Sequence, residues 1–219
     1  MTNEPLIALI SATPTAIPAA TAAILERIPT ARVWNIVDDR LLSDAQMAGT
    51  VTPQLEERMQ RLIAHALLEK PDSVLLTCSQ YGAVARRTTA TIPVLPPDDA
   101  AFEQVIAGGY RTVLVLASLE SARDDTVRRL TETLAAAGVS ADIESRVVAN
   151  AAEYAALGNT TALLDVLASA AAGDHDAVLL AQYSLSTVAG ELASATGKRV
   201  ISGPTAAAES IDATLRRAP

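Results

Sequence analysis

Residues 74–82 read Val-Leu-Leu-Thr-Cys-Ser-Gln-Tyr-Gly, and residues 178–184 read Val-Leu-Leu-Ala-Gln-Tyr-Ser. Both stretches are apolar runs that end in a polar turn, a pattern typical of strands in a parallel sheet. When the two runs are superimposed, Cys78 falls on Gln182. The stretch around position 78 therefore predicts a strand, a short turn and a helix start, and it occurs a second time in the chain.

The segments that flank these two runs repeat as well. Residues 5–11 resemble residues 111–117, and residues 92–96 resemble residues 198–202. A repeat of this length predicts two similar lobes that face each other, with Cys78 and Gln182 on opposite walls of a cleft. We place the first lobe at residues 1–97 plus 205–219 and the second lobe at residues 98–204.

Strands alternate with helical patterns throughout the chain, which predicts an α/β fold with a parallel sheet in each lobe. Four strands are expected per lobe: 6–10, 32–37, 73–77 and 91–95 in the first, and 112–116, 141–148, 177–181 and 199–202 in the second. The clearest helix follows Thr52 and Pro53, a cap and a first-turn proline, and carries apolar residues at helical spacing. Further helices are expected at 18–27, 98–106, 124–137, 160–172, 188–196 and 205–217.

The composition excludes several classes of protein. The formal net charge is −8, aromatic residues make up 3% of the chain, and no basic cluster extends beyond short pairs, so nucleic-acid binding is not expected. No apolar run is long enough to span a membrane, and the amino terminus lacks the basic region of a secretory signal. With one cysteine and no possible internal disulfide, we expect a cytoplasmic protein.

The sequence also lacks the residue patterns that usually bind metals or nucleotides. The only histidines, His65 and His175, are far apart in no ligand-type pattern, and both are expected at solvent-facing positions. No glycine-rich nucleotide-binding pattern follows a strand. We therefore expect no cofactor, and small molecules rather than macromolecules as ligands.

Cys78 is the candidate nucleophile or base. It lies at the carboxyl end of a predicted strand, where α/β proteins bind ligands, and a helix start after it would favour the thiolate. Polar residues also follow the carboxyl ends of this strand and of other predicted strands. These residues are candidates for binding a substrate anion: Ser11, Thr13, Asp38, Ser79, Gln80, Tyr81, Ser118, Tyr183 and Ser184. Each serine or threonine alone is more often an ordinary helix cap, and Asp38 is as readily a turn residue.

Five motifs in order resemble the aspartate/glutamate/hydantoin racemase superfamily, which includes maleate cis–trans isomerase and arylmalonate decarboxylase. They are residues 36–42, 74–79, 92–95, 180–184 and 202–207. The resemblance covers nearly the whole chain. It implies two lobes related by a pseudo-two-fold axis, an active site between them, and one cysteine from each lobe moving a proton on opposite faces of the substrate.

The chain departs from that pattern at the second cysteine. Cys78 matches the first position, but Gln182 stands at the second, and an amide cannot act as a general base near neutral pH. The resemblance then leaves three alternatives: a racemase-like isomerase acting next to a carboxylate or hydantoin carbonyl, a decarboxylase of the arylmalonate type with one proton-donating cysteine, or a binding protein for small carboxylates without catalysis. It also leaves open a homodimer or a higher homo-oligomer.

Overall fold

The computed structural model describes residues 4–217. The chain divides into two compact α/β units, which we call the first and second lobes. The first lobe comprises Met1–Asp99 and Ala207–Pro219, and the second comprises Ala100–Ala206. The boundaries expected from the sequence, after residues 97 and 204, lie two residues before these.

The first lobe is built on a parallel sheet with the strand order β2-β1-β3-β4. The strands are β1 (Leu6–Ser11), β2 (Arg32–Val37), β3 (Ser73–Leu76) and β4 (Val94–Leu95). Its helices are α1 (Ile17–Arg27), α2 (Arg40–Ala48), α3 (Pro53–Leu68) and α4 (Gly82–Arg87), and all but the first residue of α5 (Asp99–Gly108) belong to the second lobe. Helix α10 (Gly203–Arg217) contains the second boundary and returns the chain to the first lobe.

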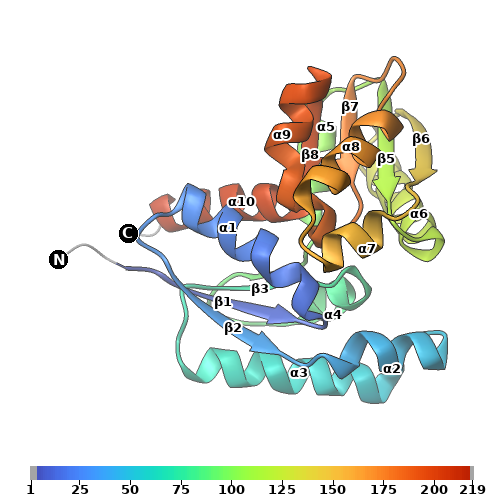
Figure 1. Cartoon of the computed structure of the whole chain (residues 1–219). Helices are drawn as coiled ribbons and strands as arrows, with labels where there is room; N and C mark the ends of the chain where they lie inside the picture. The colour runs from blue at the N-terminus through green and yellow to red at the C-terminus, as the bar shows by residue number, and fades with distance from the viewer. Residues whose placement is uncertain (1–3, 218–219) are drawn as a thin grey trace. The chain divides into compact units, whose positions relative to one another are not determined.

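Both faces of this sheet are covered by helices, with α1 on one face and α3 on the other (Figure 1). Alternate residues of the central strands, such as Ala8 and Ile10, pack with Met59 and Ile63 of α3 in one buried cluster. Side chains along a strand alternate between the two faces, so a strand covered on both sides must be apolar at every position. This requirement explains why β1 and β3 read as unbroken apolar runs.

The second lobe repeats the arrangement, with the strand order β6-β5-β7-β8 and parallel pairing throughout. Its strands are β5 (Thr112–Ala117), β6 (Asp142–Val147), β7 (Ala177–Leu180) and β8 (Arg199–Ser202). Its helices are α6 (Glu120–Ala136), α7 (Ala151–Ala156), α8 (Thr160–Ala170) and α9 (Ala189–Thr196). The prediction of two similar α/β lobes with four-stranded parallel sheets is confirmed.

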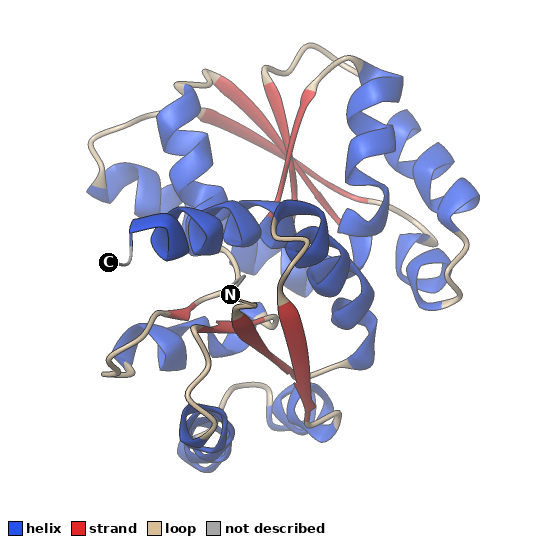
Figure 2. Cartoon of the chain, turned by 90° about the vertical axis from the view of Figure 1, so that its left-hand side faces the viewer, coloured by secondary structure: helices blue, strands red, loops and turns tan. Residues whose placement is uncertain are grey.

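Two buried clusters, one on each face, hold the second sheet. Val113 and Val115 of β5 pack with α5 and α6, whereas Leu114 and Leu116 pack with α8 and α9. Figure 2 shows helices on both sides of this sheet. The burial of successive strand residues in opposite layers fixes the register of β5, because a slip by one residue would exchange the two sets of partners.

Each lobe also contains one helix that the sequence patterns do not predict. Helices α2 and α7 follow the second strand of their lobes, β2 and β6. Helix α2 buries only Leu41 and Ala45, and α7 buries only Ala151. Helices of six to nine residues are too short to be stable alone, so α2 and α7 depend on packing against neighbouring elements.

The amino-terminal ends of the two central strands are held by equivalent aspartates. Asp72 accepts a hydrogen bond from the backbone N–H of Leu6 at 2.7 Å, and Asp176 accepts one from Thr112 at 3.0 Å. Asp176 also accepts one from the N–H of Arg111 at 2.8 Å. These backbone bonds hold the pKa of the Asp176 carboxyl below its usual value. The repeat thus extends to a polar contact that ties the first strand of each lobe to the third.

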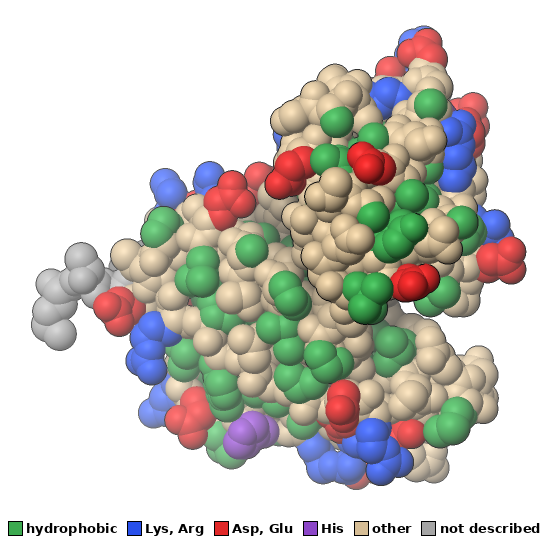
Figure 3. Space-filling view, viewed as in Figure 1, with side chains coloured by type: hydrophobic (Ala, Val, Ile, Leu, Met, Phe, Trp, Pro, Cys, Tyr) green, Lys and Arg blue, Asp and Glu red, His purple; other side chains and the backbone are tan. Residues whose placement is uncertain are grey.

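Basic and acidic side chains lie beside one another on the face shown in Figure 3, without a separate basic patch there. Within residues 4–217, no helix is both long enough and apolar enough to cross a membrane.

Candidate functional site

Cys78 lies two residues after the last residue of β3, at the carboxyl edge of the first sheet, as the sequence predicts. Its backbone is extended, with φ −117° and ψ 119°, and it precedes a three-residue 3-10 helix, Ser79–Tyr81, that leads into α4. The cysteine is 9% exposed and packs in the same cluster as Ala12 and Tyr81. The helix start that the sequence predicts after the thiol consists of this 3-10 turn and the six-residue helix α4.

Two other predicted site residues lie at the same edge because β1 is between β2 and β3. The Ser11 carbonyl accepts a hydrogen bond from the N–H of Asp38 at 3.0 Å. The Ser11 hydroxyl accepts one from the hydroxyl of Thr77, the residue before Cys78, at 2.9 Å. The fold thus brings Ser11, Asp38 and Cys78 together at one edge of the first sheet, with Ser11 bonded to the segment that carries the thiol.

The Asp38 side chain is used in an ion-pair network. Arg58 of α3 donates to both of its carboxylate oxygens at 2.5 Å, and it also donates to Asp44 of α2 at 3.0 Å. The Asp38 carboxylate further accepts the N–H of Arg40 at 3.3 Å, as a turn-forming aspartate does. These contacts tie α2 and α3 to the end of β2, and they give Asp38 a structural role that needs no substrate.

Tyr81 is a core residue of the first lobe. Its side chain has no exposed surface, and its hydroxyl donates to the backbone carbonyl of Leu41 in α2 at 2.8 Å. Burial, and secondarily the charge of Cys78, raises the pKa of Tyr81 to about 12, although the nearby Arg58 opposes this shift. A phenol with this pKa stays protonated at neutral pH and holds α2 against the segment after Cys78.

The remaining predicted residues of the first lobe are more accessible. Ser79 and Thr13 are half-buried, and Gln80 is exposed. The Thr13 hydroxyl shares a 3.1 Å hydrogen bond with the hydroxyl of Thr15. All three follow a strand at its carboxyl end, so their hydroxyl and amide groups belong to the same edge as Cys78.

Hydrogen bonds in the two lobes give Cys78 and Gln182 equivalent backbone positions. The N–H of Thr77 donates to Ile10, and in the second lobe the N–H of Ala181 donates to Leu116. Three residues after each site, the N–H of Tyr81 donates to the carbonyl of Cys78, and that of Leu185 donates to the carbonyl of Gln182, both at 3.1 Å. Gln182 also has extended backbone angles and precedes a 3-10 helix. The predicted alignment of thiol and amide therefore holds at the level of backbone geometry.

Gln182 and Ser118 form a closed polar pair at the carboxyl edge of the second sheet. The Oε1 atom of Gln182 accepts from the Ser118 backbone N–H at 2.7 Å and from its hydroxyl at 3.1 Å. The Nε2 atom donates back to the Ser118 hydroxyl at 2.9 Å. The sequence placed both residues at this edge, and the structure shows that they contact each other. Of the other predicted residues here, Tyr183 is buried in its lobe and Ser184 is half-buried.

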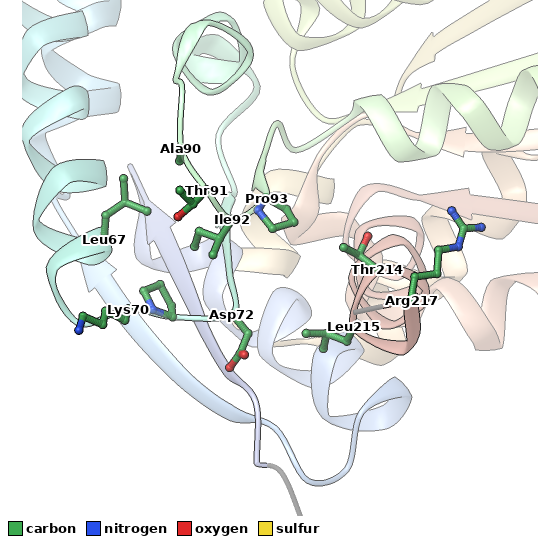
Figure 4. Close-up of a pocket in the computed structure, with 11 residues that line it drawn as sticks. Leu67, Lys70, Asp72, Ala90, Thr91, Ile92, Pro93, Thr214, Leu215 and Arg217 are labelled. Carbon is green, nitrogen blue, oxygen red and sulfur yellow. The ribbon is translucent and has the colours of Figure 1, made fainter. Parts of the chain in front are cut away.

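A cavity of about 770 Å³ lies elsewhere in the first lobe (Figure 4). Its lining includes Lys70 and Asp72, which precede β3, and Ile92 and Pro93, which precede β4. The strands are parallel, so this cavity is at the amino-terminal edge of the sheet, opposite the edge that carries Cys78. It is not part of the candidate site.

The prediction that both histidines face solvent is correct for His65 and wrong for His175. The His175 side chain is only 7% exposed, and its Nε2 lies 2.8 Å from a carboxylate oxygen of Glu144. A tight turn at Gly173, with φ 120°, packs against the imidazole. Sequence reasoning read the surrounding acidic residues as a solvated turn, but tertiary packing covers the ring. Within residues 4–217, no group of three or more His, Cys, Asp or Glu side chains is suited to hold a metal ion.

Comparison with solved structures identifies the architecture. The chain aligns with aspartate racemase from Picrophilus torridus at a TM-score of 0.72 and 14% identity, covering 97% of this chain and 94% of that one. It aligns with allantoin racemase from Klebsiella pneumoniae at a TM-score of 0.70 and 14% identity, covering 97% and 88%. Maleate isomerase from Pseudomonas putida S16 gives a TM-score of 0.65 at 16% identity, covering 98% and 94%.

The chain has the aspartate/glutamate racemase fold. This finding confirms the fold that the resemblance of the five sequence motifs implies. A scan against protein-family models finds no match, and no curated protein matches the sequence. At identities of 14% to 16%, the likeness establishes the fold, and the reaction must be argued from the residues themselves.

Proposed function

We propose that this chain is a cofactor-independent isomerase of the racemase type, in which Cys78 alone moves a proton at the carbon next to a carboxylate or a hydantoin carbonyl. The observation that carries the proposal is the equivalence of positions 78 and 182. Two repeats of one backbone hold a thiol at one position and an amide at the other, on a fold that aspartate racemase and maleate isomerase share.

In the proposed reaction, the Cys78 thiolate removes the α-proton. The S–H bond forms, the C–H bond breaks, and its electron pair moves onto the adjacent carbonyl oxygen to give an enediolate from a carboxylate or an enolate from a hydantoin. The same thiol then returns the proton on the same face: return to the α-carbon regenerates the substrate with its configuration retained, and return to a conjugated neighbouring carbon gives the isomer, with the double bond shifted. Because the Gln182 amide is not basic near neutral pH, position 182 supplies no second proton-transfer group.

Hydrogen exchange tests the proposal directly. The full chain is incubated in deuterated water with single enantiomers of amino acids, hydroxy acids and substituted hydantoins, and deuterium at the α-carbon is measured by NMR. We expect exchange with retained configuration for at least one compound. The Cys78→Ala variant should lose about 10²–10⁴-fold of the rate, the usual contribution of a general base.

Other outcomes decide against the proposal. CO₂ release from substituted malonates, without α-proton exchange on other acids, would replace it with a decarboxylase. No exchange and no CO₂ release across the panel, with a Cys78 thiol inert to alkylation at neutral pH, would leave a binding protein.

Replacing the amide by a second thiol is the matching gain-of-function experiment. Gln182→Cys restores a proton-transfer group at the equivalent backbone position, so we expect exchange to become accompanied by inversion, measured by chiral chromatography. A folded Gln182→Cys variant that exchanges as fast as the native chain but never inverts would contradict the proposed use of the two positions.

A further inference from the structure

We propose that Gln182 is a hydrogen-bond donor to the oxyanion of the reaction, and that Ser118 is the positioning residue that orients its amide. This inference rests on the proposed function for the identity of the oxyanion. It assigns a role to the position where the repeat would otherwise carry a second thiol. It also changes the expected role of Ser118 from contacting the substrate to holding the group that does.

The orientation of the amide is fixed by the backbone. A backbone N–H can only donate, so the side-chain atom 2.7 Å from the Ser118 nitrogen must be the amide oxygen of Gln182. A flipped amide would place an NH₂ group against that N–H. The Ser118 hydroxyl donates to the amide oxygen and accepts from the amide nitrogen, so it holds the amide in place, and the backbone N–H alone decides the orientation.

This orientation leaves one donor of the amide unused. The Nε2 group carries two hydrogens, and the Ser118 hydroxyl accepts one of them at 2.9 Å. In the described part of the chain, Ser118 is the only hydrogen-bond partner of the Gln182 side chain. The Ser118 N–H is itself occupied by Oε1, so the second N–H of Gln182 is the donor of this pair that no group of the described residues accepts.

Comparison of the two lobes shows that serine at position 118 accompanies glutamine at position 182. Ser118 follows β5 as Ala12 follows β1, because Ala117 and Ser11 hold equivalent places opposite the second strand. The first lobe therefore pairs its thiol with alanine, and the second pairs its amide with a serine hydroxyl. Alanine at position 118 would keep the backbone donor but remove the group that fixes the amide nitrogen.

An amide donor suits a reaction that builds negative charge. It stabilises a developing enediolate oxygen without giving up a proton, and a donor that is already oriented needs no rearrangement when charge appears. Gln182 is half-buried, which reduces the screening of that interaction by water.

The test uses oxalate, a planar dianion whose paired oxygens match those of an enediolate. In ¹H–¹⁵N spectra of the full ¹⁵N-labelled chain, the side-chain resonances of Gln182 are assigned as the pair missing from Gln182→Met. We expect saturating oxalate to move one of the two Nε2 proton resonances downfield. Cys78→Ala should preserve this shift, because the thiol is not the donor.

Variants separate the donor from its support. Gln182→Glu can still accept from both groups of Ser118, but it has no N–H and carries a like charge, so oxalate should bind about 100-fold more weakly. Gln182→Met should lose about tenfold, in the range for a hydrogen bond to a charged group. Ser118→Ala should lose affinity and broaden the Gln182 amide resonances, whereas Ser118→Thr should restore both. Ser194→Ala, which removes another serine hydroxyl bonded to a backbone carbonyl of this lobe, is the matched control.

The inference is overturned if oxalate leaves the Gln182 amide unmoved, or if Gln182→Glu binds oxalate as tightly as the native chain. These results are independent of the exchange assay. An oxalate-dependent shift without any α-proton exchange would contradict the proposed isomerase activity and support Gln182 as a hydrogen-bond donor. α-Proton exchange at an unchanged rate in Gln182→Met would support the isomerase activity and contradict the role of Gln182 as a donor.

Discussion

Replacing Ser11 by alanine removes the only acceptor that residues 4–217 provide for the buried hydroxyl of Thr77. The two oxygens are 2.9 Å apart, and the residues are 0% and 5% exposed. In Ser11→Ala, the Thr77 hydroxyl stays buried without its partner, which costs about 1–3 kcal/mol. Thr77→Val strands the Ser11 hydroxyl in the same way and should cost a similar amount, about 2 kcal/mol.

The double variant should be far less damaged than the sum of the two. Ser11→Ala with Thr77→Val removes both polar groups, and the second lobe already has Ala117 and Ala181 at the equivalent places. We expect about 2 kcal/mol for each single variant and also about 2 kcal/mol for the double, a coupling of about 2 kcal/mol between contacting residues.

Urea unfolding followed by tryptophan fluorescence measures this cycle. Trp34 is the only tryptophan, and it lies on β2 next to β1, against the edge of His65 at 5.5 Å between ring centroids. It therefore reports on the lobe that contains the Ser11–Thr77 pair. The exposed Ser194→Ala should change stability by less than about 0.5 kcal/mol. Additive single effects, with a double variant destabilised by the full sum, would refute the reasoning.

Three further predictions concern residues outside the proton-transfer step. Backbone N–H groups lower the pKa of Asp176, so its stabilising contribution is present above the ordinary aspartate value of about 3.9 and is lost as the pH falls through the lowered value. Asp176→Asn should therefore flatten the decline of the urea midpoint below about pH 4, and an unchanged acid profile would contradict this. Tyr81→Phe should cost about 1 kcal/mol by removing its buried hydrogen bond, whereas the half-buried Tyr154→Phe, whose hydroxyl has no hydrogen-bond partner within residues 4–217, should be nearly neutral in the same assay. Arg58→Met leaves Asp38 without its ion-pair partner and should lower stability by about 1–2 kcal/mol at low salt, and less in 1 M salt as screening increases; equal loss at both salt concentrations would point to packing instead.

The sequence predicted the fold well because its signals are local. Both central strands of each sheet are buried on both sides, so they must be continuous apolar runs, and such runs are visible without a structure. Cys78 and Gln182 were aligned for the same reason, since each follows one of these runs directly. The helix after Thr52 was equally clear, and the Thr52 side chain does accept the N–H of Leu55.

Contacts between residues distant in the chain were much harder to predict. Helix α2 is only nine residues long, and it is held by Tyr81 and Arg58, which lie 40 and 14 residues from their partners in that helix. His175 was misjudged because its burial comes from a turn and a strand of its lobe. The paired aspartates Asp72 and Asp176 were missed, although both directly precede the repeated strand and the alignment contained that signal.

By itself, the amino-acid sequence determined that this protein has two similar α/β lobes and that a thiol in one matches an amide in the other. It did so because continuous apolar runs and the polar turns that end them are visible in consecutive residues. Only the tertiary structure decided which partners the polar groups at the strand ends bind. Asp38 accepts from Arg58, Ser11 accepts from Thr77, and Gln182 accepts from Ser118. A hydrogen bond depends on distance and direction between side chains that the chain separates by up to 66 residues, and only folding sets these quantities.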